Sequence, residues 1–332
     1  MGARAAMTAR LLPAVAFAGL LALGPAQAAQ KKPDPAGKSW AADQVEAPAT
    51  AADPAYAAFD AGRYMEAMKL AEAAAAKGDG PSYTMLGQLY EQGLGVPQNF
   101  AKAAEYYAKG AAIGDVDSLF SLGVMLAAGQ GIKQNKSQAA QFFELAAAKN
   151  HPIALYNLAL IYADGSERPQ DLRKAAEFLE KAANLDHAPA QYDLAGFYKE
   201  GRAIAPDDKK YLYWLGRAAE GGLPAAELEY GIALFQGYGI TPPSQKAGIA
   251  MIRRAAEKGN PVAQNRLARA YAYGAGVEVN MVEAAKWHLL SRHVGLSDFK
   301  LDQIVGGLNA DDRKKAEKAA FDYQQATDAL LQ

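Results

Sequence analysis

The chain has 332 residues but no cysteine and only four histidines. Without a thiol there can be no cysteine nucleophile, no thiolate-bound metal and no disulfide. A bacterial lipid anchor is also excluded, because it needs a cysteine at the cleavage point. Any folded part of this chain is therefore held together by packing alone.

Charge of one sign is not in excess either, since 35 basic and 36 acidic residues give a formal net charge of −1. A protein that binds nucleic acid usually presents a basic stripe, and none is visible here. We therefore expect no nucleic-acid partner. The abundance of alanine and the small number of β-branched residues predict an all-α fold.

The sequence contains no H-E-x-x-H, G-x-S-x-G or P-loop string. The acidic pairs at 207–208 and 311–312 lie where helices are predicted to begin, so we interpret them as helix caps and not as catalytic acids. We therefore predict no catalytic residues.

The four histidines do not form a metal-binding pattern. His151 and His187 are 36 residues apart in predicted turns, and we interpret them as turn residues because equivalent positions of a repeat cannot share one metal ion. His288 and His293 are five residues apart on a predicted helix, a spacing that does not place both on one face. We predict no metal and no cofactor.

The first 28 residues have the features of a signal peptide. Arg4 and Arg10 precede a thirteen-residue apolar stretch, residues 11–23, and an A-x-A motif ends at Ala28. We expect cleavage near Ala28 and a periplasmic or secreted protein with no stable membrane anchor afterwards. The alternative is an uncleaved anchor, for which an apolar stretch interrupted by Pro13 is short.

Residues 29–53 are mostly Ala, Pro, Lys, Asp and Gln, which predicts a flexible linker. A docking tail or a spacer is the alternative interpretation.

From residue 80 onward the chain repeats itself. The repeated stretches start 36, 36, 36, 36 and 37 residues apart, at Ser82, Ser118, Ala154, Ala190, Ala226 and Ala263.

Each unit predicts two helices joined by a glycine-containing loop. In the third unit, Ala154, Leu158 and Tyr162 form a stripe at i, i+4 and i+8 on one face of the first helix. The loop glycine, here Gly165, is suited to end that helix in a left-handed conformation. Small residues seven apart on the second helix allow two helices to approach closely, so each unit is predicted to be an αα-hairpin that stacks on its neighbours.

The pattern A-x-x-x-L-G-x-x-Y, then G-x-G-V, then A-A-x-x-Y/F and A-A-x-x-G-D/H resembles the Sel1-like repeat family, which is related to tetratricopeptide repeats. The clearest copy runs from Tyr83 to Asp115. The resemblance implies a right-handed superhelical α/α solenoid of about six repeats at 81–297. We expect a tetratricopeptide-like capping hairpin at 54–80 and C-terminal capping helices at 298–332, the second opening at Asn309.

Related helical repeats bind partners on the concave side lined by their first helices. Carried over by position, that surface is predicted to contain Phe120, Val124, Tyr156, Leu160, Tyr192, Leu228, Ile232 and Phe235. Asn157 and Asp193, which are adjacent in the repeat register, are expected to hold a peptide backbone by hydrogen bonds. The corresponding positions of the sixth repeat are Asn265, Arg269 and Ala272. Two interpretations remain open: the aromatic residues anchor an apolar helix or extended peptide, or they belong to the packing of the repeat itself.

The resemblance implies an exported scaffold or adaptor that binds a protein or peptide partner in the cell envelope and is not an enzyme. A regulator of a membrane sensor kinase is one form of this role. A peptidoglycan- or β-lactam-binding hydrolase-like protein is one alternative, although the Sel1-like proteins associated with β-lactams depend on disulfides. A structural spacer without a groove ligand is the other.

Overall fold

The computed structural model describes residues 53–165, 168–240 and 242–330, and the regular elements in these ranges are all helices. The predicted signal peptide and nearly all of the predicted linker lie outside the described residues. The described chain forms two compact units that divide after Gln170, between the two helices of the third repeat. None of the described helices is long and apolar enough to cross a membrane.

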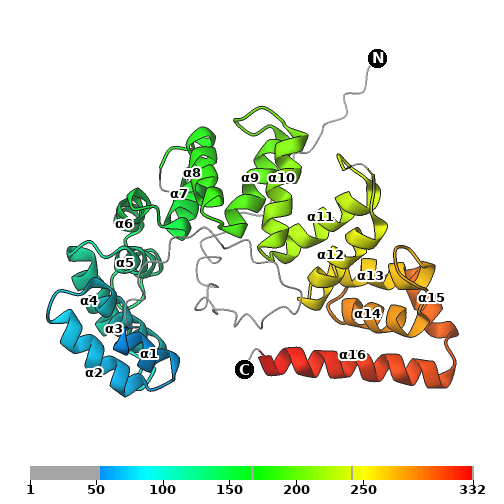
Figure 1. Cartoon of the computed structure of the whole chain (residues 1–332), viewed down its shortest axis with the longest axis horizontal. Helices are drawn as coiled ribbons and strands as arrows, with labels where there is room; N and C mark the ends of the chain where they lie inside the picture. The colour runs from blue at the N-terminus through cyan, green and yellow to red at the C-terminus, as the bar shows by residue number, and fades with distance from the viewer. Residues whose placement is uncertain (1–52, 166–167, 241, 331–332) are drawn as a thin grey trace, which may run out of the picture. The chain divides into compact units, whose positions relative to one another are not determined.

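In the first unit each helix packs on the next one along the chain (Figure 1). This is the contact pattern of an α solenoid, as the repeats predict. The helices are α1 (Pro54–Asp60), α2 (Tyr64–Ala75), α3 (Gly80–Gln92), α4 (Phe100–Ala112), α5 (Val116–Ala128), α6 (Lys136–Ala148) and α7 (Pro152–Asp164).

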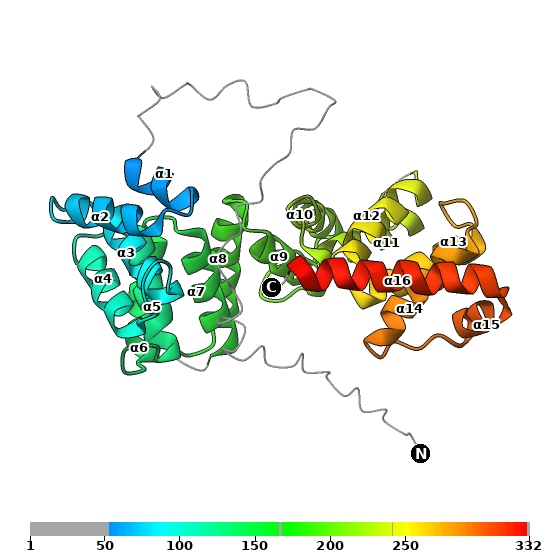
Figure 2. The same cartoon turned by 90° about the horizontal axis from the view of Figure 1, so that it is seen from below.

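The second unit continues the same pattern up to its last helix, which packs against α14 (Figures 1 and 2). Its helices are α8 (Leu172–Asn184), α9 (Ala188–Glu200), α10 (Asp208–Glu220), α11 (Pro224–Gln236), α12 (Gln245–Glu257), α13 (Pro261–Tyr273), α14 (Met281–His293), α15 (Phe299–Gly307) and α16 (Ala310–Leu330). The predicted terminal helix pairs, α1 with α2 and α15 with α16, are therefore present.

The first helix of every repeat ends at a glycine in the left-handed conformation, with φ between 70° and 76°. An L-residue with a side chain adopts this conformation only at a cost, so glycine here stops the helix and turns the chain toward the second helix. These glycines are Gly93, Gly129, Gly165, Gly201, Gly237 and Gly274.

The two turn histidines are N-caps. His151 Nδ1 accepts a hydrogen bond from the backbone N–H of Ala154 at 3.1 Å, and His187 Nδ1 accepts one from Ala190 at 3.3 Å. An N-cap side chain satisfies a backbone donor that the first helical turn leaves unpaired. The prediction that they are turn residues is confirmed, and Asp207 likewise caps α10.

Close contact between the two helices of a repeat depends on small residues. A Cβ added at Gly123 would lie 2.8 Å from the Phe143 ring, so the α5 backbone packs directly against that ring. In the fifth repeat Gly231 and Gly248 face each other, and a Cβ on Gly248 would overlap the carbonyl oxygen of Gly231. In the third repeat, Leu158 directly precedes the small residue at this position, and its side chain is fully buried.

The last helix closes the second unit with an aromatic side chain. Tyr323 of α16 donates a hydrogen bond from its hydroxyl to the Glu257 carbonyl at 2.8 Å, at the end of α12. Its ring lies edge-on to Trp287 of α14, with 5.5 Å between the centroids. A terminal helix that covers the end of the stack in this way supplies the neighbour that the last repeat lacks.

Replacement of Leu158 by alanine is expected to lower the free energy of unfolding of the first unit by about 2–5 kcal/mol, because the cavity left in a packed core adds to the lost burial. His151→Ala removes one N-cap and is expected to cost about 1 kcal/mol. Urea denaturation followed by circular dichroism measures both. Equal losses for the two variants would contradict the assignment of Leu158 to the core.

Candidate partner-binding site

The predicted groove residues of the first unit lie on α5 and α7. Phe120 is half-buried, with its ring stacked on His151 at 4.5 Å between centroids and tilted against Phe143 at 5.8 Å. These contacts favour a role for Phe120 in the packing of the repeat. Asn157 is buried, with 4% of its surface exposed, and its role in holding a peptide backbone stays a prediction. The remaining three, Val124, Tyr156 and Leu160, are half-buried.

The predicted residues of the second unit have three different environments. Tyr192 and Asp193 are half-buried on α9, and the Tyr192 hydroxyl donates a 2.6 Å hydrogen bond to Glu229. Burial and this bond raise the pKa of Tyr192. Leu228 is 9% exposed and lies in the hydrophobic core with Ile252, and its role as a partner anchor stays a prediction. Leu228 was predicted from its register, two residues before the position at which the repeat usually has leucine, and this register does not show how deeply the side chain is packed.

Ile232 and Phe235 are half-buried, and they line a cavity of about 190 Å³. Its walls come from α11, α12 and α13 and are mostly apolar. Besides these two residues they consist of Gln236, Ile249, Ile252, Arg266, Arg269, Ala270, Tyr273 and Ala275. We call this the apolar cavity.

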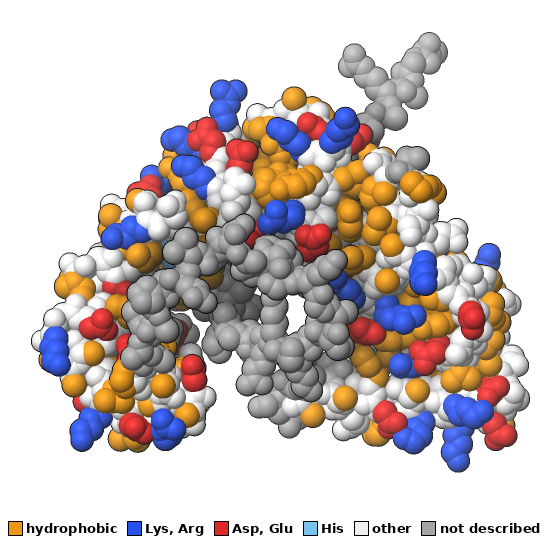
Figure 3. Space-filling model, viewed as in Figure 1, with side chains coloured by type: hydrophobic (Ala, Val, Ile, Leu, Met, Phe, Trp, Pro, Cys, Tyr) orange, Lys and Arg blue, Asp and Glu red, His pale blue; other side chains and the backbone are white. Residues whose placement is uncertain are grey.

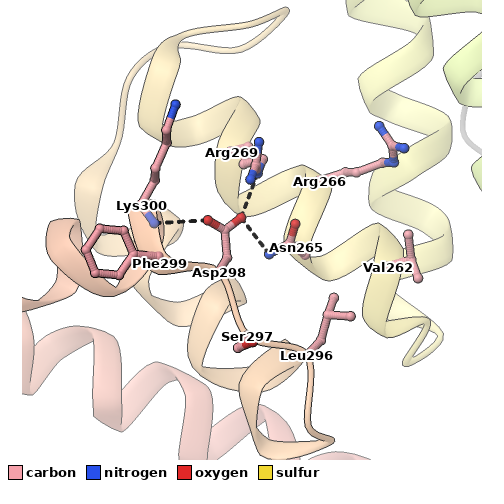
Figure 4. A pocket seen from close by; sticks show the side chains of 9 residues that line it. All are labelled: Val262, Asn265, Arg266, Arg269, Leu296, Ser297, Asp298, Phe299 and Lys300. Atoms are coloured by element: carbon pink, nitrogen blue, oxygen red, sulfur yellow. Dashed lines mark hydrogen bonds and ion pairs between the residues drawn. The ribbon is translucent and has the colours of Figure 1, made fainter.

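A second cavity, of about 630 Å³, lies between α13 and the segment that leads into α15 (Figure 4). It shares Arg266 and Arg269 with the apolar cavity, so the two adjoin. We call this the charged cavity. Its lining consists of Val262, Asn265, Arg266, Arg269, Leu296, Ser297, Asp298, Phe299 and Lys300.

The carboxylate of Asp298 stands at the centre of the charged cavity. Its Oδ2 accepts hydrogen bonds from Arg269 Nε at 2.7 Å and from Asn265 Nδ2 at 3.2 Å, while Oδ1 accepts from the backbone of Lys300 and Leu301 (Figure 4). Burial raises the pKa of Asp298, but the hydrogen bonds from Arg269 and Asn265 outweigh it and the pKa lies below its usual value. The carboxylate therefore stays ionised and joins α15 to α13.

Large apolar side chains stand exposed at the rim of the two cavities. Phe299 is 74% exposed, Tyr273 57% and Val262 42%. Hydrophobic side chains also gather between charged ones over α11–α14 on the face of the second unit that is in view (Figure 3). A cluster of this kind, rimmed by polar groups, is typical of a protein interaction surface.

Other polar clusters of the second unit join helices. His288 is buried and its Nε2 lies 2.9 Å from Asp302, which links α14 to α15. Buried Glu227 of α11 forms ion pairs with Arg254 of α12 and with Lys258, which directly follows α12, each at 2.8 Å. Among the described residues, no group of three or more His, Asp and Glu side chains is placed to hold a metal ion.

The sequence model of the Sel1 repeat family matches this chain six times, at residues 80–115, 116–151, 152–187, 188–223, 224–260 and 261–291. The chain belongs to the Sel1 repeat family. The six matches confirm the six predicted repeats. Sel1 repeats form scaffolds that generally serve protein interaction, and proteins built from them are typically not enzymes.

Two solved structures extend this comparison. A Sel1 repeat protein from Oxalobacter formigenes is 26% identical with a TM-score of 0.67, over 72% of this chain and 98% of that one. A protective antigen present in uropathogenic Escherichia coli, which displays an SLR fold, is 27% identical with a TM-score of 0.50, over 79% of this chain and 64% of that one. None of the curated proteins compared with the sequence matches it.

Several residues that line the two cavities were not predicted as site residues. Arg269 occupies a predicted groove position, but the predicted anchors are mainly apolar or aromatic and do not include it. Asp298 and Phe299 belong to the segment between α14 and α15, where the 36-residue pattern has ended. No periodicity places that segment against α13, so the sequence offers no signal for it.

We expect Asp298→Ala to lower the free energy of unfolding of the second unit by about 1–3 kcal/mol, because it removes both the α15 cap and the partner of Arg269. Asp298→Asn keeps a capping oxygen and should cost less. Since the folded pKa is lowered, the stabilisation is complete above the unfolded pKa of about 3.9 and is lost as the pH falls through the lower folded value.

Urea denaturation between pH 7 and pH 3 measures this effect, and Asp298→Asn should remove that part of the pH dependence. If Asp298→Ala unfolds at the same urea concentration as the wild type, the carboxylate does not hold α15 on α13.

Proposed function

We propose that this Sel1-repeat protein is an exported scaffold that holds a segment of a partner protein in the cell envelope. The observation that supports it most directly is the pair of adjoining cavities in the second unit, with Phe299, Tyr273 and Val262 exposed around them. Exposed aromatic side chains beside a cavity are the residues that most often dominate the free energy of a protein interface.

The arrangement of the two adjoining cavities also suits the binding of an extended segment. The charged cavity of about 630 Å³ is bordered by exposed Lys300 and Phe299, while the apolar cavity of about 190 Å³ is bordered by exposed Tyr273. An extended peptide places alternate side chains in separate pockets, and two adjoining cavities suit that mode.

Export is supported by the N-terminal pattern of Arg4, Arg10, the apolar stretch 11–23 and the motif ending at Ala28. A partner in the envelope follows from export. A membrane sensor kinase is the partner that we propose to test first, since the family resemblance implies roles of that kind.

Intact-mass analysis of the protein purified from its native host is expected to give a chain that starts near Ala29, because signal peptidase cleaves after an A-x-A motif. A variant with Ala28→Leu should be processed poorly and retain its apolar stretch. A mature wild-type chain that retains residues 11–23 would overturn the proposal of export by a cleaved signal.

Truncation of the two exposed aromatic residues, Phe299→Ala with Tyr273→Ala, is expected to weaken capture of the envelope partner by about tenfold or more, since interface aromatics typically contribute about 2 kcal/mol or more. Both side chains are more than half exposed, so the melting temperature should change little. Quantitative pull-down from solubilised envelopes, beside circular dichroism, measures the two effects.

Phe321→Ala is the matched control, because Phe321 is a 62% exposed phenylalanine of α16 that lines neither cavity. If the protein is only a structural spacer, the double variant, Phe321→Ala and the wild type should all capture the same amount of envelope protein. A hydrolase-like protein would show capture of peptidoglycan fragments in place of a protein, and either result would contradict the proposed scaffold.

A further inference from the structure

We infer that the two cavities of the second unit bind an acidic segment of a partner protein, with an apolar side chain in the apolar cavity and an adjacent carboxylate on Arg266. This inference rests on the proposed function and specifies the chemistry of the partner. Three observations support it: the volume of the apolar cavity, the positive charge of the residues that line the two cavities, and the hydrogen bonds by which Arg269 and Asn265 hold the Asp298 carboxylate.

The apolar cavity has the size of one large apolar side chain. Its volume is about 190 Å³, and half of the ten residues that line it are the aliphatic or aromatic Ile232, Phe235, Ile249, Ile252 and Ala270. An apolar protein cavity of about 150 Å³ is large enough to bind benzene. A leucine, methionine or phenylalanine side chain therefore fits this volume, and its transfer from water is favourable.

The charge of the lining is positive. The residues that line the two cavities include three cations, Arg266, Arg269 and Lys300, and one carboxylate, Asp298, which leaves two positive charges in excess. Arg269 is paired with Asp298 at 2.7 Å. Arg266 and Lys300 are exposed and form no ion pair with the described residues. An anionic ligand complements this surface, and a cationic one does not.

Asp298 shows how the site recognises a carboxylate. Arg269 and Asn265 donate to one of its oxygens from successive turns of α13. Arg266 lies three residues before Arg269 on the same helix, and its side chain extends away from Asp298 (Figure 4). Its guanidinium can therefore hold a second carboxylate, supplied by the partner, beside the one that the chain itself supplies.

Arg266 also lines the apolar cavity, so the two recognition elements adjoin. A partner residue that fills the apolar cavity brings its neighbours in sequence to Arg266. An acidic-apolar peptide segment satisfies both requirements at once. Nucleic acid supplies no apolar side chain for the apolar cavity.

Selection of random twelve-residue peptides displayed on phage, against the mature chain of residues 29–332, tests this inference. Peptides enriched on the wild type should contain an apolar residue close to Asp or Glu. A labelled representative should lose about tenfold or more in affinity on Arg266→Glu, measured by fluorescence anisotropy, because the substitution places like charges together. Selection on Arg266→Glu should instead enrich Lys and Arg.

Lys246→Glu is the matched control, since Lys246 is an exposed cation of the same unit that lines neither cavity. It should bind the peptide as the wild type does. The inference is overturned if no peptide is enriched, if enriched peptides lack acidic residues, or if Arg266→Glu binds them equally. Should the envelope partner still be captured through Phe299 and Tyr273, the scaffold proposal stands while the inference on the acidic segment fails.

Discussion

The contact between the two helices of each repeat is the interaction on which the rest of the structure depends. A small residue of the first helix, such as Gly123, lies against a large side chain of the second, such as Phe143. Alanine takes this position in the third repeat, at Ala159, and two glycines bring the α11 and α12 backbones together at Gly231. Because the spacing recurs every 36 or 37 residues, each hairpin presents nearly the same faces to its neighbours.

The candidate site arises where this regularity stops. After the sixth repeat, a short segment before α15 places Asp298 and Phe299 against α13, on the side where a further repeat would otherwise continue. Asp298 is held by Arg269 and caps α15, so one carboxylate fixes the segment and neutralises one of the cations. The cavities are therefore built from repeat positions on one side and from a non-repeating segment on the other.

The sequence was sufficient for most of the fold. Glycine at the end of each first helix, small residues at fixed spacing and an N-cap at Asn309 all predict local structure, and the structure agrees. The groove was predicted less well, because helical spacing identifies a face without showing how deeply that face is packed. Leu228 and Asn157 were predicted for the same surface as half-buried Ile232 but are themselves buried. The contribution of Asp298 depends on a contact across 29 residues that no pattern encodes.

The central claim is that the cavities of the second unit contact a partner protein in the cell. Site-specific photo-crosslinking in the native host tests it most directly, with a photoreactive phenylalanine analogue at position 299 and, as the reference, at position 321 on α16. Our account predicts a discrete crosslinked protein from position 299 and none from position 321. Absence of a product at 299, or the same products from both positions, would contradict the account.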